Sequence, residues 1–354
     1  MVNLFNETTY LDYTFPQPQY LGAKYKFIDW ISSFLPNNIN NVLDAFSGSQ
    51  SVSFRFKQLG YKVITNDFLN FNHQIGISLI ENKNNILTDI DLDILFDKNS
   101  NETFFNLFQN VYTNVFFDIN ETLFLDSFRS NIDRLENRYK KSLALSIMNR
   151  SMTRKVTMGH FCHAQALNYA SNPDRIKRNR SLIRPIKDIF IDLLKDYNAS
   201  VFDNKKDNIS YNCDILELLP NLDDIDLVYF DPPYCNSHAD YQSFYHVLET
   251  YTEYWKDKEF INSTKRYEPK KYTGFDKKNN VIESLNLLFE FSKDIPYWLF
   301  SYNDRSYPDE NTIVDMISKY KKNVDVYYNK YRNGVGGKGS VAGSHEILIV
   351  ASSK

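Results

Sequence analysis

The sequence predicts an α/β protein with a doubly wound sheet that is interrupted by a mainly helical insertion. Three observations support this prediction. A strand–turn–helix–strand pattern with a glycine turn occupies residues 41–66, apolar strand-like segments return after residue 208, and the stretch between them has helical periodicity with few strand signals. At 354 residues, 42% of them hydrophobic, the chain is long and apolar enough to bury a large core.

The first part of the predicted sheet is one βαβ unit. Residues 41–46 read as an apolar strand, Gly48 as the centre of a tight turn, residues 50–59 as a helix and residues 61–65 as a second strand. Asp67 follows that strand about 20 positions after the glycine turn, the spacing at which a carboxylate meets the ribose hydroxyls of a bound nucleotide. The unit therefore predicts a nucleotide-binding half of the sheet.

The most informative segment is Asp231-Pro232-Pro233-Tyr234, which follows an apolar strand predicted at residues 226–230. Open α/β sheets bind ligands at the carboxyl ends of their strands, where these four residues fall. The prolines fix φ, and their carbonyls stay free to accept hydrogen bonds. A carboxylate, a rigid carbonyl and an aromatic face are together suited to hold a planar group that carries an exocyclic amine.

The remaining elements follow from periodicity and from turn residues. An aromatic run from Tyr241 to Trp255 is assigned to the core, with one ring lining a base pocket as the alternative. Five of the 11 glycines lie between Gly334 and Gly343 and predict a flexible hairpin loop before the last strand. Pro185 is expected to kink or break the helix that contains it. Further strands are predicted at 208–213, 296–301, 323–328 and 346–351, and further helices at 134–148, 175–194, 282–292 and 311–320.

Composition excludes several classes of protein. No apolar run approaches the roughly 20 residues of a membrane span, and no basic-then-apolar leader opens the chain, so we expect a cytoplasmic protein with no membrane partner. Cys162, Cys213 and Cys235 are odd in number and widely spaced, which argues against a disulfide framework. His160 and His163 flank Cys162, but without a second ligand pair they make a poor tetrahedral site, so no metal is expected.

Charge is distributed unevenly along the chain. Residues 129–187 hold 14 Lys/Arg and three Asp/Glu, a net charge of +11, so the rest of the chain carries −14 within the total of −3. This asymmetry is typical of a surface that binds phosphates, although a solvated helical face is the alternative interpretation. The candidate nucleic-acid contacts are Arg150, Arg154, Lys155, Arg178, Arg180 and Lys338.

These segments, in this order, resemble the Dam-like, D12 class of N6-adenine DNA methyltransferases. The resemblance covers most of the sheet and not the insertion. It implies a Rossmann-like methyltransferase fold, S-adenosyl-L-methionine as cofactor and double-stranded DNA as substrate. Residues 1–69 and 200–354 would form the catalytic domain, and residues 70–199 the target-recognition insertion. The matching segments are Tyr20-Leu21-Gly22-Ala23-Lys24, Asp44-Ala45-Phe46-Ser47-Gly48, Asp67, Asp214-Ile215, the tetrapeptide at 231–234, Ser301-Tyr302-Asn303 and His345-Glu346-Ile347-Leu348.

The resemblance also assigns roles to residues. Asp231 and the carbonyl of Pro232 would accept the two amine hydrogens of an adenine that is rotated out of the duplex, and Tyr234 would stack on that base. One position departs from the family pattern, because Gln50 stands where a second glycine is common, and it is expected to leave less room for the cofactor's methionine end. The expected catalytic residues are Asp231, Pro232, Pro233 and Tyr234. The expected cofactor contacts are Tyr20, Lys24, Asp44, Phe46, Ser47, Gly48, Asp67, Asp214, Ile215 and Asp231.

Three other functions remain open from the sequence. A cytosine-N4 methyltransferase attacks with a chemically similar amine, an RNA adenine methyltransferase shares the attraction to phosphates, and a non-catalytic DNA-binding subunit could keep the same fold. The chain is expected to be a monomer or a weak dimer. It would serve either as a modification enzyme beside a companion restriction endonuclease or as a solitary prokaryotic or phage methylase.

Overall fold

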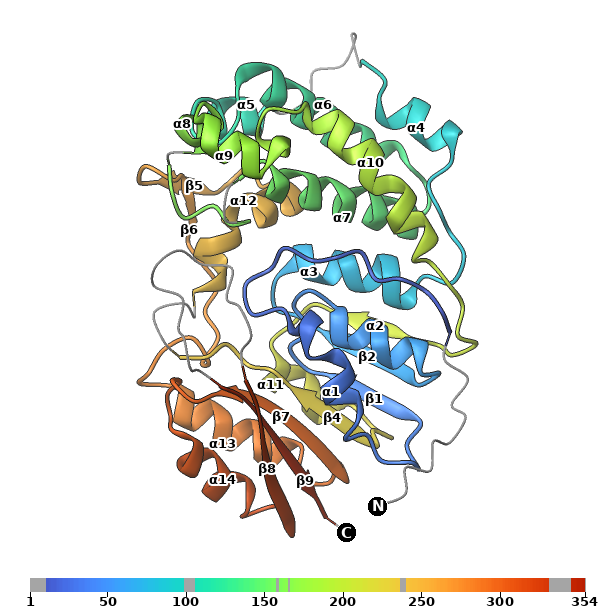
Figure 1. Cartoon of the computed structure of the whole chain (residues 1–354), viewed down its shortest axis with the longest axis vertical. Helices are drawn as coiled ribbons and strands as arrows, with labels where there is room; N and C mark the ends of the chain where they lie inside the picture. The colour runs from blue at the N-terminus through green and yellow to red at the C-terminus, as the bar shows by residue number, and fades with distance from the viewer. Residues whose placement is uncertain are drawn as a thin grey trace.

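A twisted, mostly parallel sheet forms the lower half of the molecule in Figure 1. The computed structural model describes residues 11–98, 106–156, 159–164, 166–235, 240–330 and 345–353. The glycine-rich segment before the last strand, with Lys338, lies outside the described residues. The strands are β1 (Asn41–Asp44), β2 (Lys62–Asn66), β3 (Ile209–Tyr211), β4 (Leu227–Phe230), β5 (Glu259–Ile261), β6 (Arg266–Glu268), β7 (Tyr297–Asn303), β8 (Asn323–Lys330) and β9 (His345–Ser352).

The helices cover the two faces of this sheet and build a separate layer at the other end of the molecule (Figure 1). In the sheet half they are η1 (Lys24–Lys26), α1 (Ile28–Ser32), α2 (Ser51–Gln58), α3 (Asn70–Ile75), the π-helix η2 (Gly76–Glu81), α11 (Ile215–Leu218), η4 (Leu219–Asn221), α13 (Val281–Phe291) and α14 (Glu310–Ile317). In the helical layer they are α4 (Asp89–Leu95), α5 (Leu107–Tyr112), α6 (Ile119–Arg134), α7 (Arg138–Arg154), α8 (Ala166–Ala170), α9 (Pro173–Arg178), η3 (Arg180–Leu182), α10 (Ile186–Ala199) and α12 (Tyr241–Glu253).

The sheet has seven strands in the order β3-β2-β1-β4-β7-β9-β8, which confirms the predicted α/β class with a doubly wound sheet. β9 pairs antiparallel with both of its neighbours, and the other pairs are parallel. The central strands are apolar because helices bury both of their faces; Leu43 and Val228, which are register partners, have no exposed surface. The strand order reverses between β1 and β4, so a ligand crevice is expected at their carboxyl ends.

Two predicted helices differ from the observed ones. The helix predicted from residue 134 begins only at Arg138, because the side chain of Asn137 accepts hydrogen bonds from the first free N–H groups of α7 and caps it. The single helix predicted at 175–194 is divided into α9, η3 and α10. It is interrupted at Asn179, whose backbone is extended, and again at Pro185, which precedes α10. The predicted break at Pro185 is therefore confirmed.

The helical layer is built from two separate stretches of the chain. Besides the helices between residues 89 and 199, it contains α12, which follows the tetrapeptide and packs against α3, α7 and β6. The inner side of α12 is fully buried by these neighbours, at Tyr245, Val247 and Tyr251. Conversely, η2 lies beyond residue 69 but packs on β3 of the sheet, where a Cβ at Gly76 would collide with the side chain of Ser210, while α3 packs against α7 and α12. Along the described ranges, no helix combines the length and the apolarity needed to cross a bilayer.

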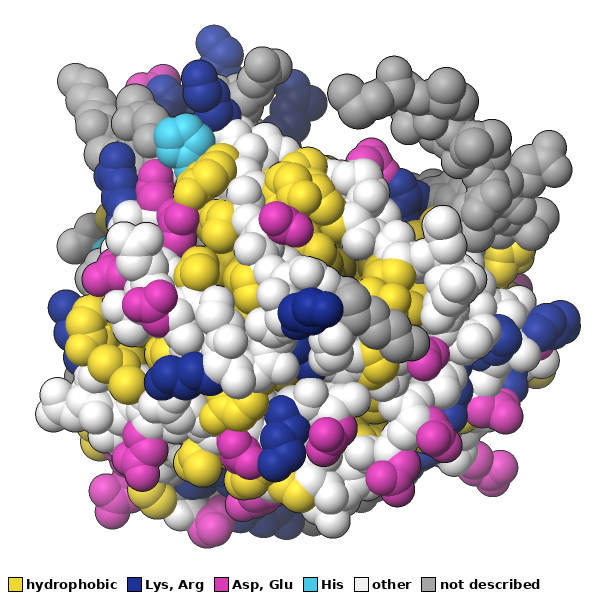
Figure 2. Space-filling model, turned by 90° about the horizontal axis from the view of Figure 1, so that it is seen from below, with side chains coloured by type: hydrophobic (Ala, Val, Ile, Leu, Met, Phe, Trp, Pro, Cys, Tyr) yellow, Lys and Arg dark blue, Asp and Glu magenta, His cyan; other side chains and the backbone are white. Residues whose placement is uncertain are grey.

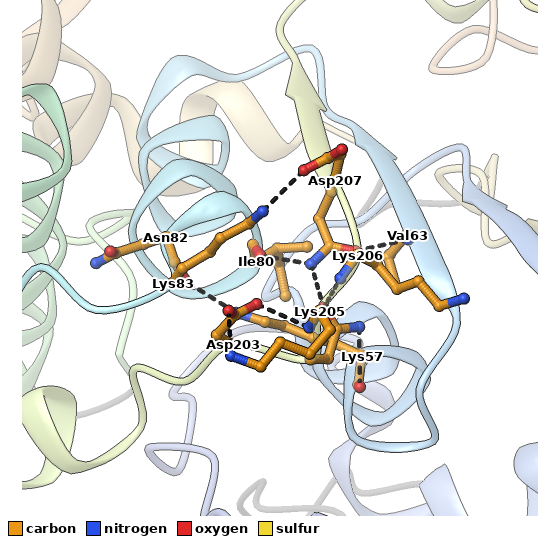
Figure 3. A network of polar contacts seen from close by, with 11 residues as sticks. Lys57, Val63, Ile80, Asn82, Lys83, Asp203, Lys205, Lys206 and Asp207 are labelled. Carbon is orange, nitrogen blue, oxygen red and sulfur yellow. Dashed lines mark hydrogen bonds and ion pairs between the residues drawn. The ribbon is translucent and has the colours of Figure 1, made fainter.

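A buried lysine ties α2 to the end of the π-helix. The side chain of Lys57 has no exposed surface, and its ammonium donates to the carbonyls of Leu79 and Asn82 at 2.9 Å each. Figure 3 shows Lys57 and Asn82 within the network of polar contacts around them. The same ammonium lies 4.4 Å from the ring centroid of Phe202. Burial lowers the pKa of Lys57 to about 7, while Asp203 acts in the opposite direction. The lysine thus caps two carbonyls that would otherwise be buried without a donor.

Replacement of Lys57 by methionine is expected to lower the free energy of unfolding by about 1–3 kcal/mol, because it leaves buried carbonyls unsatisfied. Between pH 7 and the ordinary lysine pKa of roughly 10.4 the unfolded state binds more protons than the folded state, so the native protein gains stability as the pH rises. The methionine variant lacks this gain, and the difference between the two proteins should grow with pH.

Urea unfolding at pH 7 and pH 9 measures this difference. The exposed Lys83, which forms a surface ion pair with Asp207 at 2.8 Å, is the matched control. Its replacement by methionine should change the stability little at either pH, because an exposed ion pair contributes little. Equal stabilities for the wild type and the Lys57→Met protein would contradict the capping role.

Candidate active site

One pocket lies at the carboxyl ends of β1, β2 and β4, where the strand order reverses. It opens to solvent, and its empty space, with the solvent at its mouth included, is about 1030 Å³. Folding brings together in this pocket residues that are up to 256 positions apart in the sequence, from Tyr20 to Asp276. The lining includes all thirteen of the predicted catalytic and cofactor-contacting residues: Tyr20, Lys24, Asp44, Phe46, Ser47, Gly48, Asp67, Asp214, Ile215, Asp231, Pro232, Pro233 and Tyr234.

Asp44 places a buried carboxylate at the end of β1. The residue is 1% exposed, and its Oδ2 accepts a hydrogen bond from the hydroxyl of Ser53 in α2. Burial raises the pKa of Asp44 to about 7, although the Ser53 bond acts in the opposite direction. Among the described residues, Oδ1 has no hydrogen-bond partner. A buried acceptor without a donor is costly, so this atom is suited to a ligand that brings a donor or a positive charge.

Tyr20 covers the glycine turn. Its ring is stacked on that of Tyr245 with centroids 4.8 Å apart, and on that of Tyr241 at 5.6 Å. Gly48 has a φ of 45°, and a Cβ there would lie 3.2 Å from the Tyr20 ring. A side chain at position 48 would therefore be strained and would also push the ring away from the turn. Tyr245 and Tyr241 belong to α12, so the helical layer supports this wall of the pocket.

Gln50 does not narrow the pocket as expected. Its backbone adopts the left-handed conformation (φ 64°) that a glycine would take at this position. The side chain is fully buried and is absent from the pocket lining, because its Nε2 donates to the hydroxyl of Ser47 at 2.7 Å and to the carbonyl of Asn72 at 3.3 Å. The glutamine thus turns away from the ligand side of the turn and holds the loop against α3.

Asp67 links the glycine turn to the end of β2. Its Oδ2 accepts from the N–H of Gly48 at 2.7 Å, and its Oδ1 accepts from the N–H of Leu69 at 2.8 Å and from Asn72 Nδ2 at 3.1 Å. Burial raises the pKa of Asp67 to about 6, against these three hydrogen bonds. Each carboxylate oxygen can accept about two hydrogen bonds, so Oδ2 can still accept one from a ligand hydroxyl.

Asp214 and Ile215 stand at the start of α11. Asp214 caps this helix, with Oδ1 accepting from the N–H of Leu216 at 3.0 Å. Ile215 is 2% exposed and contributes an apolar surface to the same wall as Phe46. A carboxylate beside apolar side chains is suited to bind the amine edge of a planar heterocycle.

The tetrapeptide lies inside a cluster of charged side chains. The Lys24 ammonium is 2.8 and 2.9 Å from the two oxygens of Asp231 and 3.3 Å from Oε1 of Glu346. The hydroxyl of Tyr234 lies 3.0 Å from Asp231 Oδ1 and 3.0 Å from the same Glu346 oxygen. The ammonium also donates to the carbonyl of Gly22 at 3.1 Å, so the lysine holds the N-terminal segment over the pocket.

Burial and charge pairing act in opposite directions on the pKa values of Lys24 and Glu346. Burial alone would lower the pKa of Lys24, but the carboxylates of Asp231 and Glu346 reverse the shift and raise it well above the ordinary value. Burial raises the pKa of Glu346 to about 7, while Lys24 acts against that rise. At neutral pH the lysine is therefore a permanent cation, and Glu346 is close to its titration point.

The N-terminal strap, defined here as residues 17–24, is also held from the helical layer. Arg150 in α7 donates through Nε to the carbonyl of Gln17 at 3.2 Å and through Nη1 to Gln19 Oε1 at 2.7 Å. Burial lowers the pKa of Arg150 to about 10. Arg150 was predicted to contact nucleic acid, and in the structure its guanidinium is instead engaged by the strap.

The other predicted nucleic-acid contacts occupy different environments. Lys155 is 8% exposed, and its ammonium is held by Glu121 at 2.7 Å and by the carbonyls of Leu182 and Arg184 at 3.0 and 2.8 Å. It is therefore engaged within the protein. Arg178 and Arg180 are exposed, and Arg154 is half-buried beside them, near the end of α7.

Ion pairs within the fold neutralise several cations of the basic stretch at residues 129–187, so a smaller basic surface remains. Six of the 14 cations of this stretch pair with carboxylates, five of these with acidic residues outside residues 129–187. Among the residues that the structure describes, five other cations around α9 and η3 form no ion pair, and we call them the α9 basic cluster: Arg154, Arg175, Lys177, Arg178 and Arg180.

Sequence reasoning gave no role to Glu346, and it assigned the aromatic run with Tyr241 and Tyr245 to the core without predicting that these two rings support Tyr20. Glu346 is a charged residue at the start of an otherwise apolar strand, and it is 2% exposed. That contrast in the sequence is the signal that could have drawn attention to it. Tyr241 and Tyr245 lie in an aromatic run, which is more often core packing than a binding surface.

Comparison with known proteins agrees with this geometry. Residues 20–303 match the model of the family described as D12 class N6 adenine-specific DNA methyltransferase. The chain is also 33% identical over 346 residues to the Type II methyltransferase M2.HphI of Haemophilus parahaemolyticus. That alignment covers 96% of this chain and 98% of the relative.

Proposed function

The chain belongs to the D12 class of N6 adenine-specific DNA methyltransferases, and from that premise we propose that it methylates adenine at a specific DNA site with S-adenosylmethionine as the methyl donor. The observation that carries this proposal is the pocket at the strand ends, which is lined by all thirteen predicted contacts and by a buried carboxylate oxygen that has no partner among the described residues. An adenine-specific methyltransferase needs such a pocket to place a donor beside an unstacked base.

The chemical groups of S-adenosylmethionine fit the donor and acceptor set of the pocket. Asp44 Oδ1, which has no partner within the described part of the chain, would accept from the ammonium of the methionine part, and Asp67 Oδ2 could accept from a ribose hydroxyl. Asp214 would accept a hydrogen bond from the amine of the cofactor's adenine, and Ile215 and Phe46 would provide an apolar surface for its ring. When bound, this cofactor supplies an electrophilic methyl carbon on a sulfonium.

The tetrapeptide would hold the target base. Asp231 Oδ2 accepts from Lys24 alone among the described residues, so it can also accept an amine hydrogen of the adenine. The carbonyl of Pro232 would accept the second hydrogen, and these two bonds would orient the lone pair of the nitrogen toward the methyl donor. Tyr234 stacks on the rotated base, a contact worth about 1–3 kcal/mol, which offsets part of the cost of unstacking.

DNA would dock against the helical layer through the α9 basic cluster. Arg178, Arg180 and Lys177 are exposed, and such side chains attract phosphates. The face at the sheet end, seen in Figure 2, intersperses Lys and Arg with Asp and Glu, which is unsuited to a polyanion. Arg150 and Lys155 are left out of this interface because they are engaged within the protein. Residues 70–199 would thus carry most of the target recognition.

The relative named as a Type II methyltransferase suggests the biological role. Type II methyltransferases act beside a restriction endonuclease, so we propose that this chain is the modification enzyme of such a pair. It would then protect host DNA at the sites that the companion nuclease cuts.

Incubation of the protein with radiolabelled S-adenosylmethionine and plasmid DNA, followed by nucleoside analysis, tests the function. N6-methyladenine in the DNA is the expected product. N4-methylcytosine, label in RNA only, or retarded DNA without label would each contradict the proposal and support one of the alternative functions. Sequencing of the methylated sites would then identify the recognised bases, and cleavage of unmethylated DNA by the companion nuclease would test the biological role.

Replacement of Asp67 by asparagine is expected to raise the Kd for S-adenosylmethionine on the order of 10- to 100-fold, since a charge-assisted hydrogen bond contributes roughly 1.5–3 kcal/mol. The variant also weakens the bond that shapes the glycine turn at Gly48. Isothermal titration calorimetry measures the change. Asp309→Asn, at the cap of α14 and outside the pocket lining, is the control and should bind like the wild type.

A further inference from the structure

In the charged cluster at the tetrapeptide, the single hydroxyl proton of Tyr234 faces two carboxylates that could accept it. The Tyr234 hydroxyl has one proton and lies 3.0 Å from two carboxylates, Asp231 and Glu346. With both carboxylates ionised, the hydroxyl can donate fully to only one of them. If Glu346 is protonated instead, it donates to the Tyr234 oxygen, and Tyr234 donates to Asp231. The cluster therefore has a place for one additional proton, and that place is Glu346.

The proposed reaction releases one proton at this cluster. The amine nitrogen of adenine forms a bond to the methyl carbon, and the carbon–sulfur bond breaks with its electron pair moving to sulfur. The nitrogen then carries one proton too many, and Asp231, which accepts an amine hydrogen bond, receives it first. The hydroxyl of Tyr234 lies 3.0 Å from Asp231 Oδ1 and 3.0 Å from Glu346 Oε1, so it offers this proton a path from Asp231 to a second carboxylate.

We propose that Glu346 is the terminal acceptor of the proton released by the target amine, reached from Asp231 through the hydroxyl of Tyr234. This inference rests on the proposed function of the same pocket. The proton on Asp231 moves to the Tyr234 oxygen while the Tyr234 proton moves to Glu346, so each atom in the chain keeps its valence. Glu346 acts through Tyr234 and does not touch the base; it is a positioning and relay residue.

The environment of Glu346 suits a proton acceptor near neutral pH. Its side chain is 2% exposed, and burial raises its pKa to about 7. The titratable groups that face it are Lys24 from η1, Asp231 and Tyr234 from the loop after β4, and Tyr229 from β4. Its partners across the sheet are the uncharged Asn303 in β7 and Asn329 in β8.

Glu346→Gln keeps the shape of the side chain and removes its titration. In single-turnover methyl transfer with tritiated S-adenosylmethionine, the wild-type rate should rise with pH through about 7, where Glu346 loses its proton. The variant should be slower on the order of 10- to 100-fold at pH 8 and should lack this rise. The KM values for cofactor and DNA should stay at wild-type levels, because Glu346 contacts neither.

A second readout needs no substrate. The folded pKa of Glu346 lies above its ordinary value of roughly 4.3, so the folded state binds more protons across that window and loses this stabilisation as the pH rises to about 7. The melting temperature of the wild type minus that of Glu346→Gln should therefore fall between pH 5 and pH 8. Glu249→Gln is the matched control, because Glu249 is buried, has a pKa of about 8 and lies outside the pocket lining. It should keep the wild-type rise in rate.

Tyr234→Phe removes the hydroxyl that connects Asp231 to Glu346 and leaves both carboxylates in place. This variant should also lack the rise in rate near pH 7. If either variant keeps that rise, Glu346 is not the acceptor and the inference is overturned, while an active wild type leaves the proposed function intact. If the wild-type protein itself transfers no methyl group to DNA, the proposed function fails, and the inference fails with it.

Discussion

Replacement of Asp231 by alanine is expected to reduce methyl transfer by about 10³-fold or more, because the variant loses both the orientation of the amine and the acceptor of its proton. Binding of S-adenosylmethionine should survive, since Asp44, Asp67 and Asp214 hold the cofactor in the proposed arrangement. Lys24 keeps Glu346 as a counter-ion at 3.3 Å, so the fold should lose little stability.

Tritium transfer into plasmid DNA and calorimetric titration of the cofactor measure the two effects separately. Asp231→Asn is the informative control, because its amide oxygen can still accept an amine hydrogen while the negative charge is gone. Its activity should fall between those of alanine and the wild type. Turnover of the alanine variant within tenfold of the wild type would show that Asp231 does not hold the reacting amine.

Replacement of Lys24 by methionine is expected to be the most destabilising change in the pocket, at about 3–5 kcal/mol, because two carboxylates lose the buried cation between them. The same variant should lose methyl transfer, since the strap is no longer held to the tetrapeptide. The loss of stability should be smaller at pH 6 than at pH 8, because a protonated Glu346 needs no counter-ion.

Urea unfolding at both pH values tests this expectation. The double variant Lys24→Met/Glu346→Gln removes one of the two uncompensated charges and should recover part of the lost stability. If the double variant is as unstable as the sum of the single variants, then Lys24 and Glu346 are not coupled, and the charge balance inferred for the cluster is wrong.

The pocket could be predicted because its main contacts follow parallel strands. Asp44, Asp67 and Asp231 each stand at the carboxyl end of a strand, and in a parallel sheet these ends share one edge. The same rule did not predict Glu346 as a pocket neighbour, because β9 runs antiparallel to its neighbours. Its amino end therefore meets the carboxyl ends of the others, as the pairing of Glu346 with Asn303 records.

Charge counting predicted the helical layer less well. The number of charges along the chain does not reveal that Lys155 is buried against Glu121 or that Arg150 holds the strap, because both contacts depend on tertiary packing. Periodicity likewise joined α9 and α10 into one helix, since the apolar spacing continues across the interruption at Asn179.

The placement of α12 determines how target specificity could be exchanged between relatives. A chimera that replaces residues 70–199 alone would strip α12 of its partners in α7 and expose Tyr245, Val247 and Tyr251 to water. It would also detach the aromatic support of Tyr20. An active chimera must therefore take two segments from the donor relative: the helices of the insertion, and residues 241–268, which pack on them. The catalytic loop between these two segments would remain that of the recipient.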